Sequence, residues 1–121
     1  MPDAMHRICR LDELDDPGSK EFRVGEGDWP FIGFLVRRGD RVFAYRNYCM
    51  HGGHPLNWKP DEFLTRDRKR IICASHGAMY EIDSGVCVAG PCAGRQLHAL
   101  EVTIREDEIY VRCPSEPPAL L

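Results

Sequence analysis

Apolar and polar residues alternate over short runs along this chain, and turn residues separate the runs. Residues 20–24 alternate charged and apolar side chains, which is typical of a half-exposed strand. Similar runs predict strands at residues 7–11, 31–37, 41–46, 70–73, 79–82, 86–88, 97–105 and 108–112. Many short strands separated by Gly, Pro and Asp indicate an all-β domain.

Three turn sequences predict antiparallel hairpins between neighbouring strands. They lie at residues 38–40, 83–85 and 106–107. Helical structure is expected only as single turns, at residues 11–16 and 60–64. The tail 113–121 has three prolines in nine residues, so we expect it to be extended or frayed.

The length of 121 residues suits a single domain covering 1–121. A formal net charge of −3 argues against a nucleic-acid-binding protein, which usually has a basic face. The N-terminus shows no signal-peptide pattern, and no apolar run approaches the roughly 18 residues of a membrane span. We therefore expect a soluble, cytoplasmic protein.

Two cysteine-histidine pairs, Cys49-x-His51 and Cys73-x-x-His76, are the candidate chemistry, with 21 residues between them. In a reducing compartment such pairs indicate metal ligands rather than disulfides. Two thiolates and two imidazoles are the donor set of a 2Fe–2S centre with mixed ligation. The same set also binds zinc, so the donors alone leave both open.

The other cysteines and histidines carry weaker signals. His54 lies near the first pair, but the Cys-x-His spacing favours His51 as the ligand. The cysteines outside the pairs are expected to be plain thiols: Cys9, Cys87, Cys92 and Cys113. The charged run 66–70 is expected to be a solvated loop. No catalytic residues are predicted, because no triad, paired-carboxylate or phosphate-loop pattern occurs.

The residues around the two pairs resemble the Rieske family. The resemblance extends over residues 7–112. The matching residues are Cys49-x-His51, Cys73-x-x-His76-Gly77-Ala78-x-Tyr80, Gly85, Gly90-Pro91 and Leu97. The resemblance implies a Rieske-type antiparallel β-sandwich or barrel with an inserted cluster-binding subdomain at about 47–92. It also implies one 2Fe–2S cluster, with Cys49 and Cys73 on the inner iron and Nδ1 of His51 and His76 on the outer iron.

Further residues are expected around the cluster. Gly52, Gly53 and Gly77 would turn backbone N–H groups toward sulfurs. The Tyr80 phenol would donate to a ligand cysteine, and Pro91 would belong to a loop that covers the third side of the cluster.

The chain also departs from the family pattern. The spacing between the pairs is long, and the surplus is expected between Trp58 and Lys69. His54 and Ser75 stand where respiratory members carry a loop-stapling disulfide, and Ala78 replaces a serine that donates to a sulfide. These differences point to the soluble ferredoxin and oxygenase branch. We expect a reduction potential in the lower half of the family range of about −150 to +300 mV.

The predicted function is that of a one-electron carrier, not an enzyme. It would pass electrons from a flavin-dependent reductase to a terminal oxygenase, as a monomer without nucleic-acid or membrane partners. Two alternatives remain: a component resembling the small subunit of nitrite reductase, which often lacks the cluster, and a zinc-stapled binding module.

Overall fold

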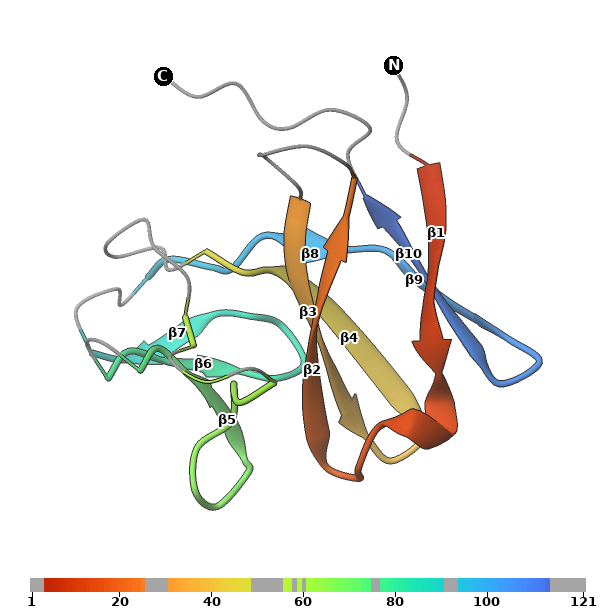
Figure 1. Cartoon of the computed structure of the whole chain (residues 1–121). Helices are drawn as coiled ribbons and strands as arrows, with labels where there is room; N and C mark the ends of the chain where they lie inside the picture. Colours follow the sequence, from red (N-terminus) through yellow and green to blue (C-terminus); the bar gives the residue numbers. More distant parts are fainter. Residues whose placement is uncertain are drawn as a thin grey trace.

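The computed structural model describes residues 4–25, 31–48, 56, 57, 59, 61–74, 77–90 and 94–113. These residues form ten strands and one 3₁₀ turn (Figure 1). In chain order they are β1 (Ala4–Arg10), η1 (Leu11–Glu13), β2 (Gly18–Val24), β3 (Phe31–Arg38), β4 (Arg41–Arg46), β5 (Arg70–Ile72), β6 (Met79–Glu81), β7 (Cys87–Ala89), β8 (Ala99–Leu100), β9 (Val102–Arg105) and β10 (Glu108–Cys113).

The strands form three antiparallel sheets. The first sheet has the order β1-β10-β9, and the second has the order β2-β3-β4-β8. The third sheet, β5-β6-β7, is small and lies apart from the other two, on the left of Figure 1. We call the first two sheets the base and the third the small sheet. The expected all-β, antiparallel architecture is confirmed.

The central strand β3 separates two hydrophobic cores. Phe31 and Leu35 face a core shared with β1 and β10. Phe34 and Val36 face a second core shared with the small sheet. Successive side chains of a strand point to opposite faces, so burial of both faces explains the continuous apolar run in β3. β4 is likewise buried on both faces, because Ala44 lies in the first core and Tyr45 in the second.

All three predicted hairpins are present, as β3-β4, β6-β7 and β9-β10. The predicted strand 97–105 is wrong as one element, because β8 pairs with β4 whereas β9 pairs with β10. The chain changes sheets between them, at Glu101. The helical turn after β1 is confirmed as η1. No helix forms in the described residues 61–64, where Leu64 instead bridges to Ile71. The tail from residue 114 lies outside the described residues.

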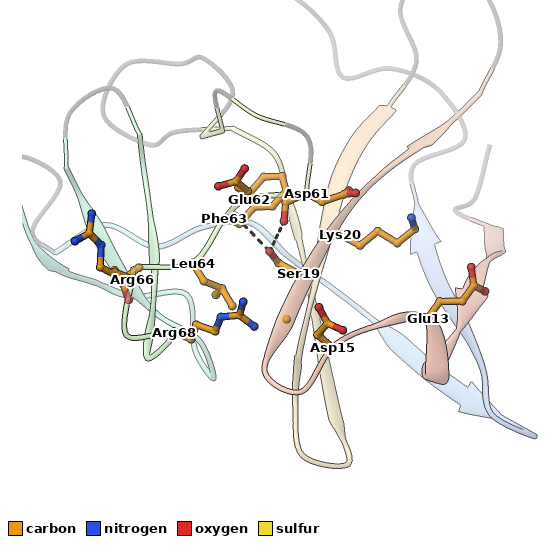
Figure 2. A pocket seen from close by; sticks show the side chains of 12 residues that line it. Glu13, Asp15, Ser19, Lys20, Asp61, Glu62, Phe63, Leu64, Arg66 and Arg68 are labelled. Carbon is orange, nitrogen blue, oxygen red and sulfur yellow. Dashed lines mark hydrogen bonds between the residues drawn. The ribbon is translucent and has the colours of Figure 1, made fainter.

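The segment that leads into the small sheet is fastened to β2 of the base. The Ser19 hydroxyl donates to the Asp61 carbonyl at 2.6 Å and accepts the Phe63 N–H at 3.3 Å, as Figure 2 shows. The Glu21 N–H donates to Asp61 Oδ1 at 2.8 Å. The Phe63 ring then stacks on Phe34, with 4.2 Å between centroids. Polar and apolar contacts together hold the small sheet against the base.

Within the part of the chain that is described, no helix has the length and apolar character to cross a bilayer.

Candidate metal centre

Cys73 is the one predicted ligand that lies within the described residues. It directly follows β5 and is fully buried in the core of the small sheet. Tyr80, on β6, and Phe63 belong to the same core and are also fully buried. The Cys73 sulfur therefore sits in apolar surroundings, which would favour a site of low net charge.

A short backbone loop encloses the position of the second ligand pair. The Cys73 N–H donates to the Ala78 carbonyl, and the Gly77 N–H donates to the Cys73 carbonyl, both at 2.8 Å. Gly77 has φ +71°, and a side chain there would meet open space. This glycine therefore supplies backbone conformation. Its own N–H donates to the carbonyl of Cys73, so any N–H group that it turns toward a sulfur would belong to a neighbouring residue.

Asn47 closes the loop that carries the first ligand pair, and the sequence reasoning missed it. Its Oδ1 accepts the Leu56 N–H at 2.8 Å, and its Nδ2 donates to Asn57 Oδ1 at 2.9 Å. It is the one buried polar or charged residue in the described part of the chain. These hydrogen bonds join residue 47, at the start of the loop, to residues 56 and 57, at its end. A polar residue directly after strand 41–46 was the available signal.

Backbone contacts bring three loop regions together around Cys73. The Ala74 N–H, beside Cys73, donates to the Leu56 carbonyl at 2.8 Å, which joins the two ligand loops. Gly90, after β7, approaches Ala78 so closely that an added Cβ would lie 2.8 Å from the Ala78 Cα. The residues before the expected proline loop thus pack against the second ligand loop.

Several predicted residues lie outside the described residues. These are the ligands Cys49, His51 and His76, the alternative His54, and Gly52, Gly53 and Pro91. The described residues contain no group of three or more metal-binding side chains. The ligand set as a whole thus stays a prediction, anchored at Cys73.

The expectation for Cys87 is wrong. Cys87, on β7, forms a disulfide instead of being a plain thiol. Cys92 lies outside the described residues. Spacing along the chain gave no indication of which sulfurs meet in space. Cys9 and Cys113 are buried in the base, and burial raises the pKa of the Cys9 thiol, as expected of inert structural thiols.

The donor set fits an iron–sulfur centre in electrostatic terms. Two ferric ions, two sulfides and two thiolates are formally neutral, and the imidazoles add no charge. A neutral centre avoids most of the large penalty of placing net charge in a buried site. The apolar core around Cys73 suits such a centre.

Comparison with known proteins bears on the choice between an iron–sulfur centre and a zinc site. The sequence matches the Rieske [2Fe-2S] domain over residues 4–114. The chain belongs to this family. The family is defined by a 2Fe–2S cluster, so the zinc-stapled module loses its support, and the expected Rieske-type fold is confirmed.

Individual relatives include a ferredoxin of nearly the same length. Ferredoxin CarAc of Metapseudomonas resinovorans is 29% identical over 107 residues, covering 87% of this chain and 90% of its own. Human apoptosis-inducing factor 3 is 28% identical over 109 residues, which cover 90% of this chain but 16% of that protein. A solved complex of reduced oxygenase and oxidized ferredoxin in carbazole 1,9a-dioxygenase contains a chain with a TM-score of 0.67 and 25% identity, covering 89% of this chain and 92% of that one.

Proposed function

We propose that this Rieske protein is a one-electron carrier that serves other redox proteins and has no catalytic site of its own. A 2Fe–2S centre of mixed ligation accepts and returns one electron. Cys49 and Cys73 would hold the inner iron, and His51 and His76 the outer one. A flavin-dependent reductase would supply the electron and a terminal oxygenase would receive it, in the cytoplasm, with the carrier as a monomer.

The observation that carries this proposal is the enclosure of Cys73. The Cys73 loop is closed by its own backbone bonds, and the adjacent Ala74 is bonded to the end of the first ligand loop. The described residues that flank the two predicted ligand pairs are thereby joined, since Asn47 also accepts the Leu56 N–H. Such preorganisation supports ligands that must keep their positions in both oxidation states.

The relatives support the direction of electron flow. One relative that matches nearly end to end is named a ferredoxin, and one similar solved chain belongs to a complex of ferredoxin with an oxygenase. We also propose the division of this chain that was predicted from the sequence: a single domain with a cluster-binding subdomain at about 47–92. The small sheet lies within those bounds.

Metal and sulfide analysis of the purified protein tests the proposal. We expect two irons and two acid-labile sulfides per chain, and a visible absorption band that bleaches on reduction with dithionite. Cys73→Ser should abolish iron and colour. Cys113→Ser is the matched control, because this buried cysteine lies in the core of the base and the variant should keep both.

The other outcomes would point elsewhere. One zinc without sulfide would indicate a structural metal site, and a colourless protein without metal would indicate a structural subunit resembling the small component of nitrite reductase. A midpoint potential above about +200 mV would contradict the expected lower half of the family range.

A further inference from the structure

The turn that leads into β5 carries a concentrated positive charge. Residues 65–70 hold four basic residues and one acidic residue, a net +3 in a chain whose formal net charge is −3. The remaining residues therefore carry a net −6. A local charge opposite to that of the rest of the molecule attracts an anionic partner to one place on the surface.

This basic turn is ordered by its own hydrogen bonds. Leu64 bridges to Ile71, and the Thr65 N–H donates to the Arg70 carbonyl at 2.8 Å. The one carboxylate, Asp67, accepts the Thr65 hydroxyl at 2.6 Å and the Lys69 N–H at 3.0 Å. These bonds lower the pKa of Asp67. Its carboxylate remains exposed, so the turn presents four basic charges and one negative charge to solvent.

Two of the four basic side chains remain available. Arg68 donates to the Pro17 carbonyl at 2.8 Å, and Arg70 lies 3.7 Å from Glu81. Arg66 and Lys69 form no ion pair within the described part of the chain, and both are exposed. In Figure 2, Arg68 reaches toward β2 whereas Arg66 points away from it.

A hollow of mixed lining adjoins the basic turn on the outer face of the small sheet. Its volume is about 720 Å³, and apolar side chains on one side face the polar side chains of the turn on the other. The lining residues are Met79, Val88 and Ala89 from the small sheet, and Thr65, Arg66, Asp67 and Arg70 from the turn. Val88 is 45% exposed and Val86, two residues earlier, is 37% exposed. Cys87 between them is buried, so both valines face outward. They are two of the four large apolar residues that are exposed in the described part of the chain.

We propose that the basic turn and this hollow form a docking surface for an acidic protein segment that also presents apolar side chains. The proposal rests on the proposed electron-carrier function, because it assigns the surface to a protein redox partner. Carboxylates of the partner would contact Arg66 and Lys69, and an apolar side chain would fill the hollow beside Val88.

The position of the basic turn and the charge of the molecule both favour an acidic protein segment as the partner. The turn and Cys73 lie at opposite ends of β5, roughly 10 Å apart along the strand. A partner held at the turn would thus leave the ligand loops accessible for electron transfer. An extended polyanion such as DNA is disfavoured, because two available cations give little counterion release and the net −6 of the other residues repels it.

Fluorescence anisotropy tests the surface with a short labelled peptide that alternates glutamate and leucine. The double variant Arg66→Glu/Lys69→Glu should weaken binding by about tenfold or more. Arg23→Glu/Arg105→Glu is the matched control, because it makes the same charge change at two exposed residues of the base and should leave binding nearly unchanged. Val88→Ser should weaken binding of this peptide, but not of one that alternates glutamate and serine.

Each remaining outcome is decisive. Equal loss in both double variants, or equal binding of a DNA oligonucleotide, would reduce the surface to unspecific charge attraction and overturn the proposal. Sedimentation that shows self-association abolished by Arg66→Glu/Lys69→Glu would assign the surface to a second copy of the chain and overturn it as well. The iron content of the same samples is measured separately. A protein that contains iron but does not bind the peptide would overturn only the proposed docking surface. A protein that binds the peptide but contains no iron would overturn the proposed electron-carrier function.

Discussion

The base and the small sheet are built by different means. In the base, β2 and β3 pair over seven positions and β3 and β4 over six. In the small sheet, β5 and β6 pair over three positions and β6 and β7 over two. The base is therefore held by long backbone ladders. The small sheet depends on buried side chains and on hydrogen bonds within and between its loops.

This difference shows where the architecture allows a redox centre. Long ladders leave little freedom to place ligands, whereas loops joined at their ends can aim donors inward. The cost is that the small sheet has few backbone bonds of its own and relies on the base behind it. Substitutions at its contacts with the base and within its loops should therefore affect the metal centre, whereas substitutions within the base should affect stability alone.

The largest effect is expected from Phe63→Ala, which removes the ring stacked on Phe34 between the two regions. Loss of a buried aromatic ring costs about 3–5 kcal/mol of the free energy of unfolding. Chemical denaturation should show that loss, and a chelator should strip iron from the variant faster. Ile109→Ala, in the core of the base, should also destabilise the fold but leave the rate of iron loss per folded molecule unchanged. Equal acceleration in both variants would contradict the division into two regions.

Gly90→Ala should act through contact and conformation together. The new Cβ would lie 2.8 Å from the Ala78 Cα, at a residue with φ +90°. We expect a loss of about 2–4 kcal/mol, because neither backbone can move away without disturbing the loop. Gly39→Ala has a similar φ, +66°, but meets open space, so thermal unfolding should show a loss of about 1 kcal/mol. Similar losses in the two variants would contradict the close packing of Gly90 on Ala78.

Asn47→Ala should loosen the first ligand loop. The substitution leaves the buried Leu56 N–H without its side-chain acceptor, which costs about 1–3 kcal/mol. Denaturation measures the loss, and iron release should be faster. Asn57→Ala is the control, because it keeps the bond from Leu56 to Asn47 and should have a smaller effect on both. An Asn47 variant that holds iron as firmly as the wild type would show that the loop does not need this closure.

Tyr45 connects the regions through a hydrogen bond from its hydroxyl to the Ile82 carbonyl, at 2.7 Å. Burial raises the pKa of Tyr45 to about 12. The folded state therefore binds the phenolic proton more tightly than the unfolded state, whose tyrosine pKa is about 10. This contribution to stability is complete below about pH 10 and is lost as the pH rises through about 12. The stability advantage of the wild type over Tyr45→Phe should thus shrink above pH 10, and an advantage independent of pH would contradict the shift.

Much of the base could be predicted from the sequence, because local patterns determine it. The alternation in residues 20–24 and the turn at residues 38–40 correspond directly to β2 and to the β3-β4 hairpin. Two features could not be read locally. Glu101 shows no sign that the chain changes sheets there, because the change depends on which strands lie alongside. Burial of β3 on both faces likewise depends on a second core.

The sequence predicts a kind of metal centre, which the family match supports, but it does not predict the contacts around that centre. The Cys-x-His pattern identifies ligand types, because thiolate and imidazole are uncommon at such spacing without a metal. Asn47 and the disulfide of Cys87 escaped prediction. Both depend on positions that come together only in the folded chain. The basic run 66–70 was expected to be a solvated loop, and its residues 66–69 are exposed. Its place beside a hollow of the small sheet has no local signature in the sequence.

The first and last strands of the described fold are neighbours, and this has a consequence for how the domain can be used. Ala4 lies opposite Cys113, where β1 and β10 pair. The first and last described residues therefore lie at the same end of the β1-β10 pair, and the small sheet lies on the other side of the base in Figure 1. A larger protein that contained this domain could therefore connect to it through two adjacent strands, with the small sheet on the side away from those connections.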